Sequence, residues 1–98
     1  MYRHGDVIII PAQSIPTDAT RRPAAILARG EATGHAHRIE DPKSAEVFDF
    51  EGEGYLHITA PTARVVHDEH APIELPRGTY RFRMQREYTP KEIRCIVD

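Results

Sequence analysis

The 98-residue chain contains no tryptophan and a single cysteine, Cys95. One cysteine excludes a disulfide within the chain. The apolar neighbours Ile93, Ile96 and Val97 indicate that Cys95 is a small buried side chain and not a nucleophile. A chain without disulfides is typical of a reducing compartment, so the sequence predicts a cytoplasmic protein.

Long hydrophobic runs are also missing. The longest one, residues 7–10, is followed at once by Pro11. A membrane-spanning helix needs about 20 apolar residues, and a signal peptide needs an apolar run behind a basic start. The sequence therefore predicts neither a membrane span nor a membrane partner.

No charge of one sign dominates, because 13 Lys and Arg residues face 15 Asp and Glu residues, a net charge of −2. The most basic stretch places Arg81 and Arg83 in alternation with Tyr80 and Phe82. On a strand this alternation puts aromatics and arginines on opposite faces, whereas a nucleic-acid surface needs both on one face. We interpret the aromatics as core residues and predict no nucleic-acid partner.

Helical periodicity is absent as well, and short β-forming segments alternate with glycine- and proline-containing turns. The length and this pattern predict a single all-β domain over residues 1–98, a small barrel or sandwich of about seven or eight short strands. We expect strands at 7–10, 35–40, 45–50, 55–60, 63–66, 79–88 and 93–97, and either a strand or a helical turn at 24–29. We expect a turn at Gly5–Asp6, a loop at 12–22, a turn at Pro61–Thr62 and a connector at 71–78.

Histidine is the residue type that is concentrated: five of the six histidines lie within residues 34–70. His35 and His37 are two residues apart, so on a strand both imidazoles project from one face and can reach one ion. Gly34, just before them, permits a sharp entry of the backbone. Imidazole is the commonest metal ligand in proteins, so this pair predicts a metal site.

His67 and His70 form the second cluster, and their spacing of three residues places them on opposite faces of a regular strand. They meet only on a helical turn, across a bulge or at a tight turn. Asp68 and Glu69 lie between them as candidate catalytic proton carriers, oxygen ligands or supports of the histidines.

The predicted ligands are therefore His35, His37, His67 and His70, with a divalent transition metal (Zn, Fe, Ni, Cu or Mn) as the cofactor. In one hypothesis the metal has an open position and acts on a small-molecule substrate, with Glu69 or Asp68 carrying a proton. In the other, the metal is structural and stabilises a binding or assembly module, for example a homo-oligomer. A metal-free adaptor, with ordinary surface or core histidines, is the remaining alternative.

Two histidines stand outside this set. His57 lies on the polar face of its predicted strand without a partner nearby in sequence, so it is not included among the ligands. His4 lies close to the N-terminus, and we expect it to be solvated.

The HxH pair followed by a later Pro-x-Gly turn resembles the two sequence motifs of the cupin family. His35 and His37 match the first motif, although Gly30 is one residue closer than usual and Asp41 stands at the acidic position. Pro76 and Gly78 match the second motif, but Arg81 stands where a histidine is usual and Gln85 where an asparagine is usual. The resemblance implies a barrel with a histidine-lined site whose third ligand comes from His67 or His70, and it implies no particular activity.

The chain also resembles small bacterial and phage-borne proteins of unassigned function. The shared patterns are Gly5-Asp6-Val7, Gly34-His35-Ala36-His37-Arg38, residues 67–72 and residues 85–88. This resemblance implies one domain with the histidine clusters at its centre, and it implies no reaction.

Overall fold

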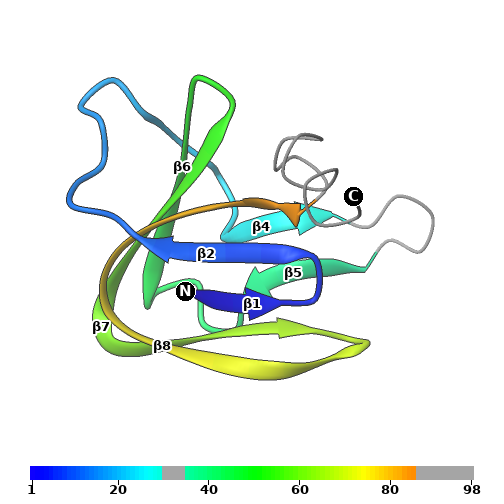
Figure 1. The fold of residues 1–98 in the computed structure, drawn as a ribbon. Coiled ribbons are helices and arrows are strands. Elements are labelled where there is room, and N and C mark those ends of the chain that lie inside the picture. The colour runs from blue at the N-terminus through cyan, green and yellow to red at the C-terminus, as the bar shows by residue number, and fades with distance from the viewer. Residues whose placement is uncertain (30–34, 86–98) are drawn as a thin grey trace.

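The computed structural model describes residues 1–29 and 35–85, and every regular element in these two ranges is a β-strand (Figure 1). The predicted strand at 93–97 and residues 86–88 of the strand predicted at 79–88 lie outside the described residues. The prediction of an all-β fold with seven or eight strands is confirmed. The strands are β1 (Tyr2–His4), β2 (Val7–Pro11), β3 (Thr20–Arg21), β4 (Ile26–Arg29), β5 (Ala36–Ile39), β6 (Ala45–Phe50), β7 (Glu53–His67) and β8 (His70–Met84).

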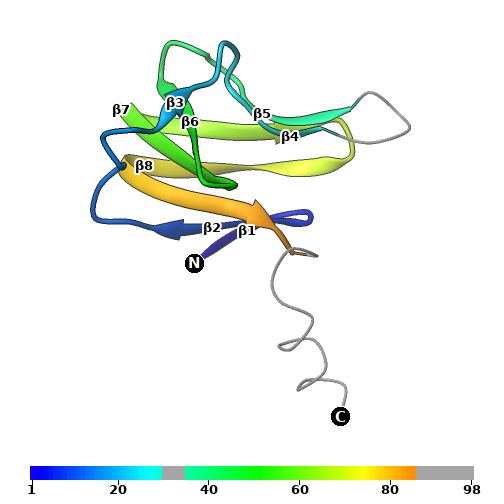
Figure 2. The ribbon, with the colours of Figure 1, turned by 90° about the horizontal axis from the view of Figure 1, so that it is seen from above.

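The strands form one antiparallel sheet that curls into a half-barrel, in the order β1-β2-β8-β7-β5-β4. Figure 2 shows this order from above, with β1 and β2 at one side and β4 and β5 at the other. The sheet branches at β7, because the first half of β7 pairs with β6 and its last residues pair with β5. None of the described elements is a helix that could cross a membrane.

The core lies on the inner face of the curl, where alternate side chains of each strand point. On β7 the buried residues are Leu56 and Ile58, and then Ala63 and Val65; on β8 they are Leu75, Tyr80 and Phe82. The burial of Tyr80 and Phe82 behind the exposed Arg81 confirms the prediction that these aromatics belong to the core.

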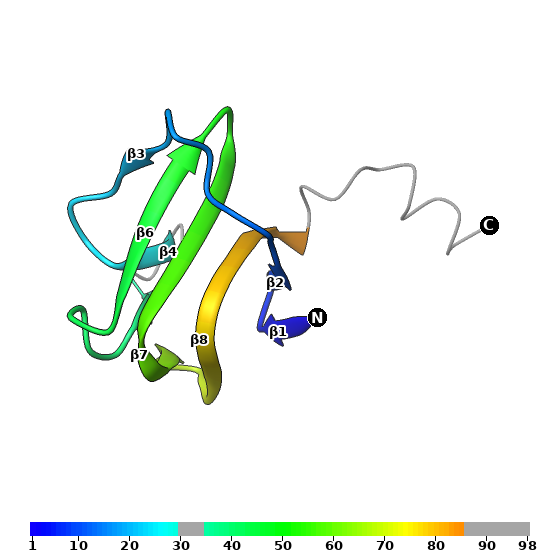
Figure 3. The same cartoon turned by 90° about the vertical axis from the view of Figure 1, so that its left-hand side faces the viewer.

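The predicted turn at Pro61–Thr62 is wrong, because β7 runs without interruption from Glu53 to His67. The strand bends here, and the register with β8 shifts between Ile58 and Thr62 (Figure 3). Among the described strands, β6 pairs with β7 only as far as Ile58, and β5 begins to pair at Val65. Pro61 also has no register partner on β8, because it lies within the register shift. It therefore lies where no described strand requires its missing N–H, which is where a sheet tolerates proline.

The predicted connector at 71–78 is also wrong, since these residues form the first half of β8. Within the described chain, this half pairs with β7 on one side, whereas β2 pairs only with residues 80–84. Pro72 and Pro76 therefore occupy an edge, where proline costs little.

Three features of residues 1–29 also bear on the sequence predictions. The Gly5–Asp6 turn is confirmed, and it joins β2 to β1, a strand that the sequence prediction did not include. The loop predicted at 12–22 contains the two-residue strand β3, which pairs with β6. Of the alternatives at 24–29, the structure contains the strand, β4.

Candidate metal centre

The imidazoles of His37, His67 and His70 meet at one end of the half-barrel. His37 and His67 continue the inward-facing positions of their strands, two residues from the buried Ile39 and Val65. The His37 ring centroid lies 4.4 Å from that of His67 and 5.5 Å from that of His70. Strand alternation therefore supplies a polar layer where the apolar core ends.

A tight turn brings His67 and His70 together. Asp68 and Glu69 form a two-residue connection between β7 and β8, and His67 and His70 are paired across it. Their ring centroids are 4.8 Å apart. Of the arrangements that the three-residue spacing allowed, the chain adopts the tight turn.

His35 lies beside this turn. Its Nε2 is 3.3 Å from Asp68 Oδ2, its Nδ1 is 3.9 Å from Glu69 Oε2, and its ring centroid is 5.7 Å from that of His67. The two carboxylate side chains are 67% and 65% exposed. Asp68 and Glu69 thus lie at the outer rim of the cluster, on the side of His35.

Two groups of side chains could hold a metal ion with nitrogen and oxygen ligands. In each, one ligand atom per residue lies within 4.8 Å of the others: an inner group of His37, His67 and His70, and an outer group of His35, His67 and Glu69. The predicted pair His35 and His37 is therefore divided between the two groups. A neutral imidazole has one lone pair to give, so His67 can serve one ion at a time and the groups are alternatives.

The hydrogen bond at His67 bears on how an ion would bind. The Glu69 backbone N–H donates to His67 Nδ1 over 3.0 Å, which uses the lone pair of that nitrogen. A metal on Nδ1 would take the same lone pair, and a metal on Nε2 would leave a proton on Nδ1. Either way, ligation by His67 breaks the bond to the Glu69 N–H.

The expectation that His4 is solvated is wrong, because His4 is only 2% exposed. Its Nδ1 lies 2.9 Å from His37 Nδ1, and its ring centroid lies 5.8 Å from that of His70. His4 is on β1 and His37 on β5, with β2, β8 and β7 between them in the sheet. The curl of the sheet brings the two strands together, so position near a terminus was a poor guide to burial.

Gly5 forms a wall of the same cluster, and it too was not included among the predicted site residues. A Cβ atom added to it would lie 2.8 Å from His70 Nε2 and 2.9 Å from His37 Cε1, and its φ is +60°. Only glycine allows the backbone to approach the imidazoles so closely in this conformation. The signal that could have identified both residues was the β-hairpin formed by Tyr2–His4 and Val7–Pro11 around the Gly5–Asp6 turn.

The surroundings keep the buried rings in the neutral, metal-binding form. The pKa of His37 is lowered from 6.5 to about 4, mainly by burial and then by the neighbouring His67, His4 and His70 rings, while Asp6 acts in the opposite direction. Burial is also the main cause that lowers the pKa of His4. The Ala71 backbone opposes this shift.

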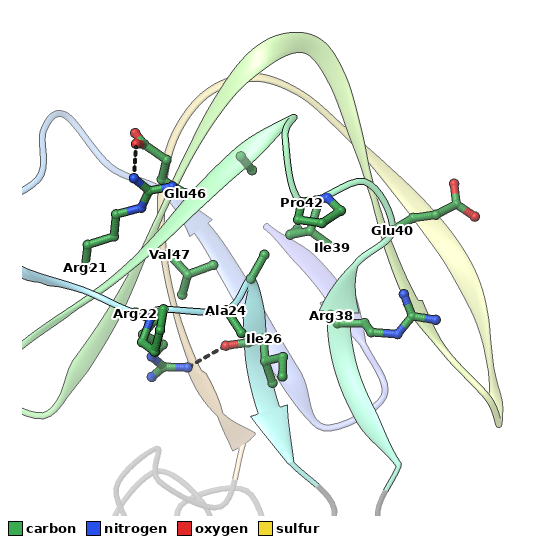
Figure 4. Close-up of a pocket in the computed structure, with 13 residues that line it drawn as sticks. Arg21, Arg22, Ala24, Ile26, Arg38, Ile39, Glu40, Pro42, Glu46 and Val47 are labelled. Carbon is green, nitrogen blue, oxygen red and sulfur yellow. Dashed lines mark hydrogen bonds and ion pairs between the residues drawn. The ribbon is translucent and has the colours of Figure 1, made fainter.

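A cavity in the described part of the chain lies away from the histidines. It has a volume of about 400 Å³ and lies between residues 21–26, β5 and β6 (Figure 4). Arg21 at its rim pairs with Glu46 over 3.3 Å, and Arg22 donates to Ile26 O and pairs with Asp49. Arg21 and Arg22 therefore already have partners within the chain.

Comparison with known protein families supplies a classification. A family model described as a domain of unknown function (DUF8820) matches residues 3–85, so the chain belongs to this family. No curated protein and no solved structure matches the chain significantly.

Proposed function

We propose that this member of the DUF8820 family binds one divalent transition-metal ion through His37, His67 and His70. One observation carries the proposal: three imidazoles from three different strands each offer a nitrogen within 4.8 Å of the others. A tetrahedral ion with nitrogens at about 2.0–2.1 Å holds them about 3.3 Å apart. Small side-chain movements would bring the three nitrogens to that spacing.

The inner group fits a transition metal better than the outer group does. Its three ligands are all imidazoles, which suit Zn, Cu, Fe and Ni, and one of them is buried. The outer group has one carboxylate and is more exposed, and carboxylates suit Mn better. His35 is then a neighbour of the metal ligands that holds the Asp68–Glu69 turn, and not a ligand itself.

An ion with three protein ligands keeps a position for water or a substrate, and His70 lies on the exposed side of the cluster. We propose that the chain is a metal-dependent enzyme acting on a small molecule. Bound at this position, a metal would polarise water or a substrate oxygen. Asp68 and Glu69, on the adjoining turn, are the groups that would accept or return a proton.

A second candidate rests on the strands that the ligands join. An ion held by β5, β7 and β8 would tie the β7–β8 turn to a strand that pairs with β7 only at Val65 and Val66. The metal would then be structural, stabilising a binding or assembly module or a homo-oligomer. The cupin relationship and the cytoplasmic location remain predictions, and the metal proposal depends on neither.

The decisive experiment measures metal stoichiometry in protein purified without an affinity tag. We expect one equivalent of Zn²⁺ in the wild-type chain and none in a His67→Ala, His70→Ala double variant. His57→Ala is the matched control, since His57 is 45% exposed and pairs with Glu46. A wild-type chain that binds no metal, or a double variant that binds as well as wild type, would refute the proposal.

The Glu69 amide supplies a local reporter for the same experiment. Its N–H hydrogen bond to His67 Nδ1 should be lost on ligation, so its NMR amide resonance should shift on addition of Zn²⁺ to the wild-type chain. The Lys43 amide, which is bonded to Asp41 Oδ1, is the control and should not move. A binding event that leaves the Glu69 resonance unchanged would exclude His67 as a ligand.

The two candidate functions differ in the ligand shell. Cobalt absorbance should change on addition of azide if a coordination position is open, as the enzyme proposal requires. In a closed structural site, the cobalt absorbance should not change on addition of azide. In either case, free Zn²⁺ at about 100 times its Kd adds about 2.7 kcal/mol to the free energy of unfolding.

A further inference from the structure

His4 is the one buried histidine that belongs to neither metal-binding group, and it touches the inner group directly. Its Nδ1 lies 2.9 Å from His37 Nδ1, and the two rings meet edge to face at 83°. Its burial and the His70 ring, 5.8 Å away between centroids, leave it little freedom. Any effect of His4 on metal binding rests on the proposed binding of the metal by His37.

A hydrogen bond between two ring nitrogens needs one N–H and one lone pair. If His37 donates, its proton is on Nδ1 and its Nε2 lone pair is available to an ion. If His4 donates instead, the neutral His37 ring carries its proton on Nε2 and has no lone pair to offer. The direction of this single hydrogen bond therefore decides whether His37 is a ligand.

The surroundings of His4 Nε2, on the other side of the ring, favour donation from His37 to His4. His4 Nε2 is buried and makes no hydrogen bond of ordinary geometry with the described residues. The backbone of Ala71 is nevertheless close enough to interact with the His4 ring as an acceptor. Because Nδ1 faces His37, Nε2 is the nitrogen left for this carbonyl. An Nε2–H can donate to it after a small rotation of the ring, whereas an unprotonated Nε2 would leave both buried acceptors without a proton between them.

We infer that His4 is a positioning residue that accepts a hydrogen bond from His37 Nδ1 and thereby holds the His37 Nε2 lone pair toward the metal. Metal-bound histidines commonly donate their other ring N–H to a carboxylate, a carbonyl or water. Here the acceptor is an imidazole on a strand at the far edge of the sheet. The backbone of Ala71, next to His70, interacts with His4, so His4 connects the β7–β8 hairpin to His37.

The first test removes the nitrogen acceptor of His4 and keeps an aromatic ring in its place. His4→Phe should bind Zn²⁺ about 10–100 times more weakly than wild type, the range found when such outer partners are lost. His4→Asn places an amide oxygen near the position of Nδ1, so it should recover part of the lost affinity. His57→Phe, the same change at a histidine outside the cluster, should leave affinity unchanged.

A second measurement on these variants distinguishes the loss of the His4 hydrogen bond from a general loss of folding. Melting of each metal-free variant is measured alongside affinity, and weaker binding counts only in chains that melt cooperatively. Equal Zn²⁺ affinity of His4→Phe and wild type would overturn the role of His4 and leave the metal proposal standing. A wild-type chain that binds no Zn²⁺ would refute both.

The second test needs no variant. Long-range ¹H–¹⁵N correlation on the metal-free wild-type chain reads which ring nitrogen carries the proton. We expect His37 protonated on Nδ1 and His4 on Nε2. The reverse pattern, His4 protonated on Nδ1 and His37 on Nε2, would overturn the inference whatever the variants do.

Discussion

Gly5 shows how the histidine cluster depends on a residue that carries no chemistry. Its φ of +60° is strained for other residues, and its missing Cβ is the space that His70 Nε2 and His37 Cε1 fill. Two separate costs therefore follow from adding one methyl group.

We expect Gly5→Ala to lower the free energy of unfolding by about 1–2 kcal/mol from backbone strain alone, and by more from the collision with the two rings. Zn²⁺ affinity should fall as well, because the rings must move. Urea unfolding and calorimetric titration measure the two effects.

Gly52→Ala is the control for Gly5→Ala. Its φ is +82°, but a Cβ there meets nothing within 4 Å. It should show the strain without the collision and should keep full Zn²⁺ affinity. An equal loss of stability in the two variants would mean that the rings at Gly5 move aside freely.

The lowered pKa of His37 predicts a pH dependence of the metal-free chain. Between pH 6.5 and about 4 the unfolded chain binds a proton at His37 that the folded chain resists. Stability should therefore be highest above pH 6.5 and should fall as the pH drops through this window. His4, whose pKa is also lowered, acts in the same direction.

Urea midpoints at several pH values between 7.5 and 4.5 measure this effect. The hydrogen bond from Arg22 holds the pKa of Asp49 below its usual value, so this carboxylate stays largely charged down to pH 4.5 and adds little to the change. A midpoint that stays constant or rises on acidification would contradict the buried, neutral placement of His37.

At the scale of elements, the sequence of the β6–β7 turn does not suit the backbone conformation of the turn. Glu51 and Gly52 both have positive φ, of 50° and 82°. This combination favours Asn-Gly, because a longer side chain at the first position is strained.

Glu51→Asn should therefore stabilise the chain by about 0.5–1 kcal/mol. Glu51→Gln removes the same charge without relieving the backbone, so it should leave stability unchanged. Thermal melting of the two variants tests the assignment of this turn. Equal stability of the two variants would exclude backbone strain as the cause.

The same scale shows where sequence patterns succeed and fail. Alternation in 55–60 and 79–84 separated inward from outward side chains correctly, because it depends only on neighbouring residues. The breaks placed at Pro61–Thr62 and 71–78 were wrong, because a proline interrupts a strand only if a partner needs its N–H. Whether a partner lies there depends on how far β2, β5 and β6 extend along β7 and β8.

At the scale of the whole molecule, Arg22 links the end of the sheet to its branch. Its Nε and Nη2 bind Asp49 of β6 over 2.7 and 2.6 Å, and its Nη1 donates to Ile26 O and Leu27 O of β4. Its guanidinium also lies 5.4 Å from the centroid of the Phe82 ring. No single hydrogen bond of a lysine could replace this fork.

Arg22→Lys should cost about 1–3 kcal/mol of stability, a range that allows for the partial exposure of the pair. Arg21→Lys is the matched control, since Arg21 is 62% exposed and makes one ion pair. It should change stability by less than about 0.5 kcal/mol. A loss of similar size in both variants would contradict the bridging role of Arg22.

Residue type and local spacing were enough to determine the fold class, the inward faces of 55–60 and 79–84, and the two histidine clusters. These features follow from period-two alternation and from side-chain chemistry, both of which act over a few residues. The curl of the sheet decided the rest. It buried His4 and placed Gly5 against two imidazoles, because β1, at one end of the strand order, meets β5, near the other end, only when a long, bent β7–β8 hairpin turns the sheet on itself. The tertiary structure also divided His35 and His37 between two groups of possible ligands.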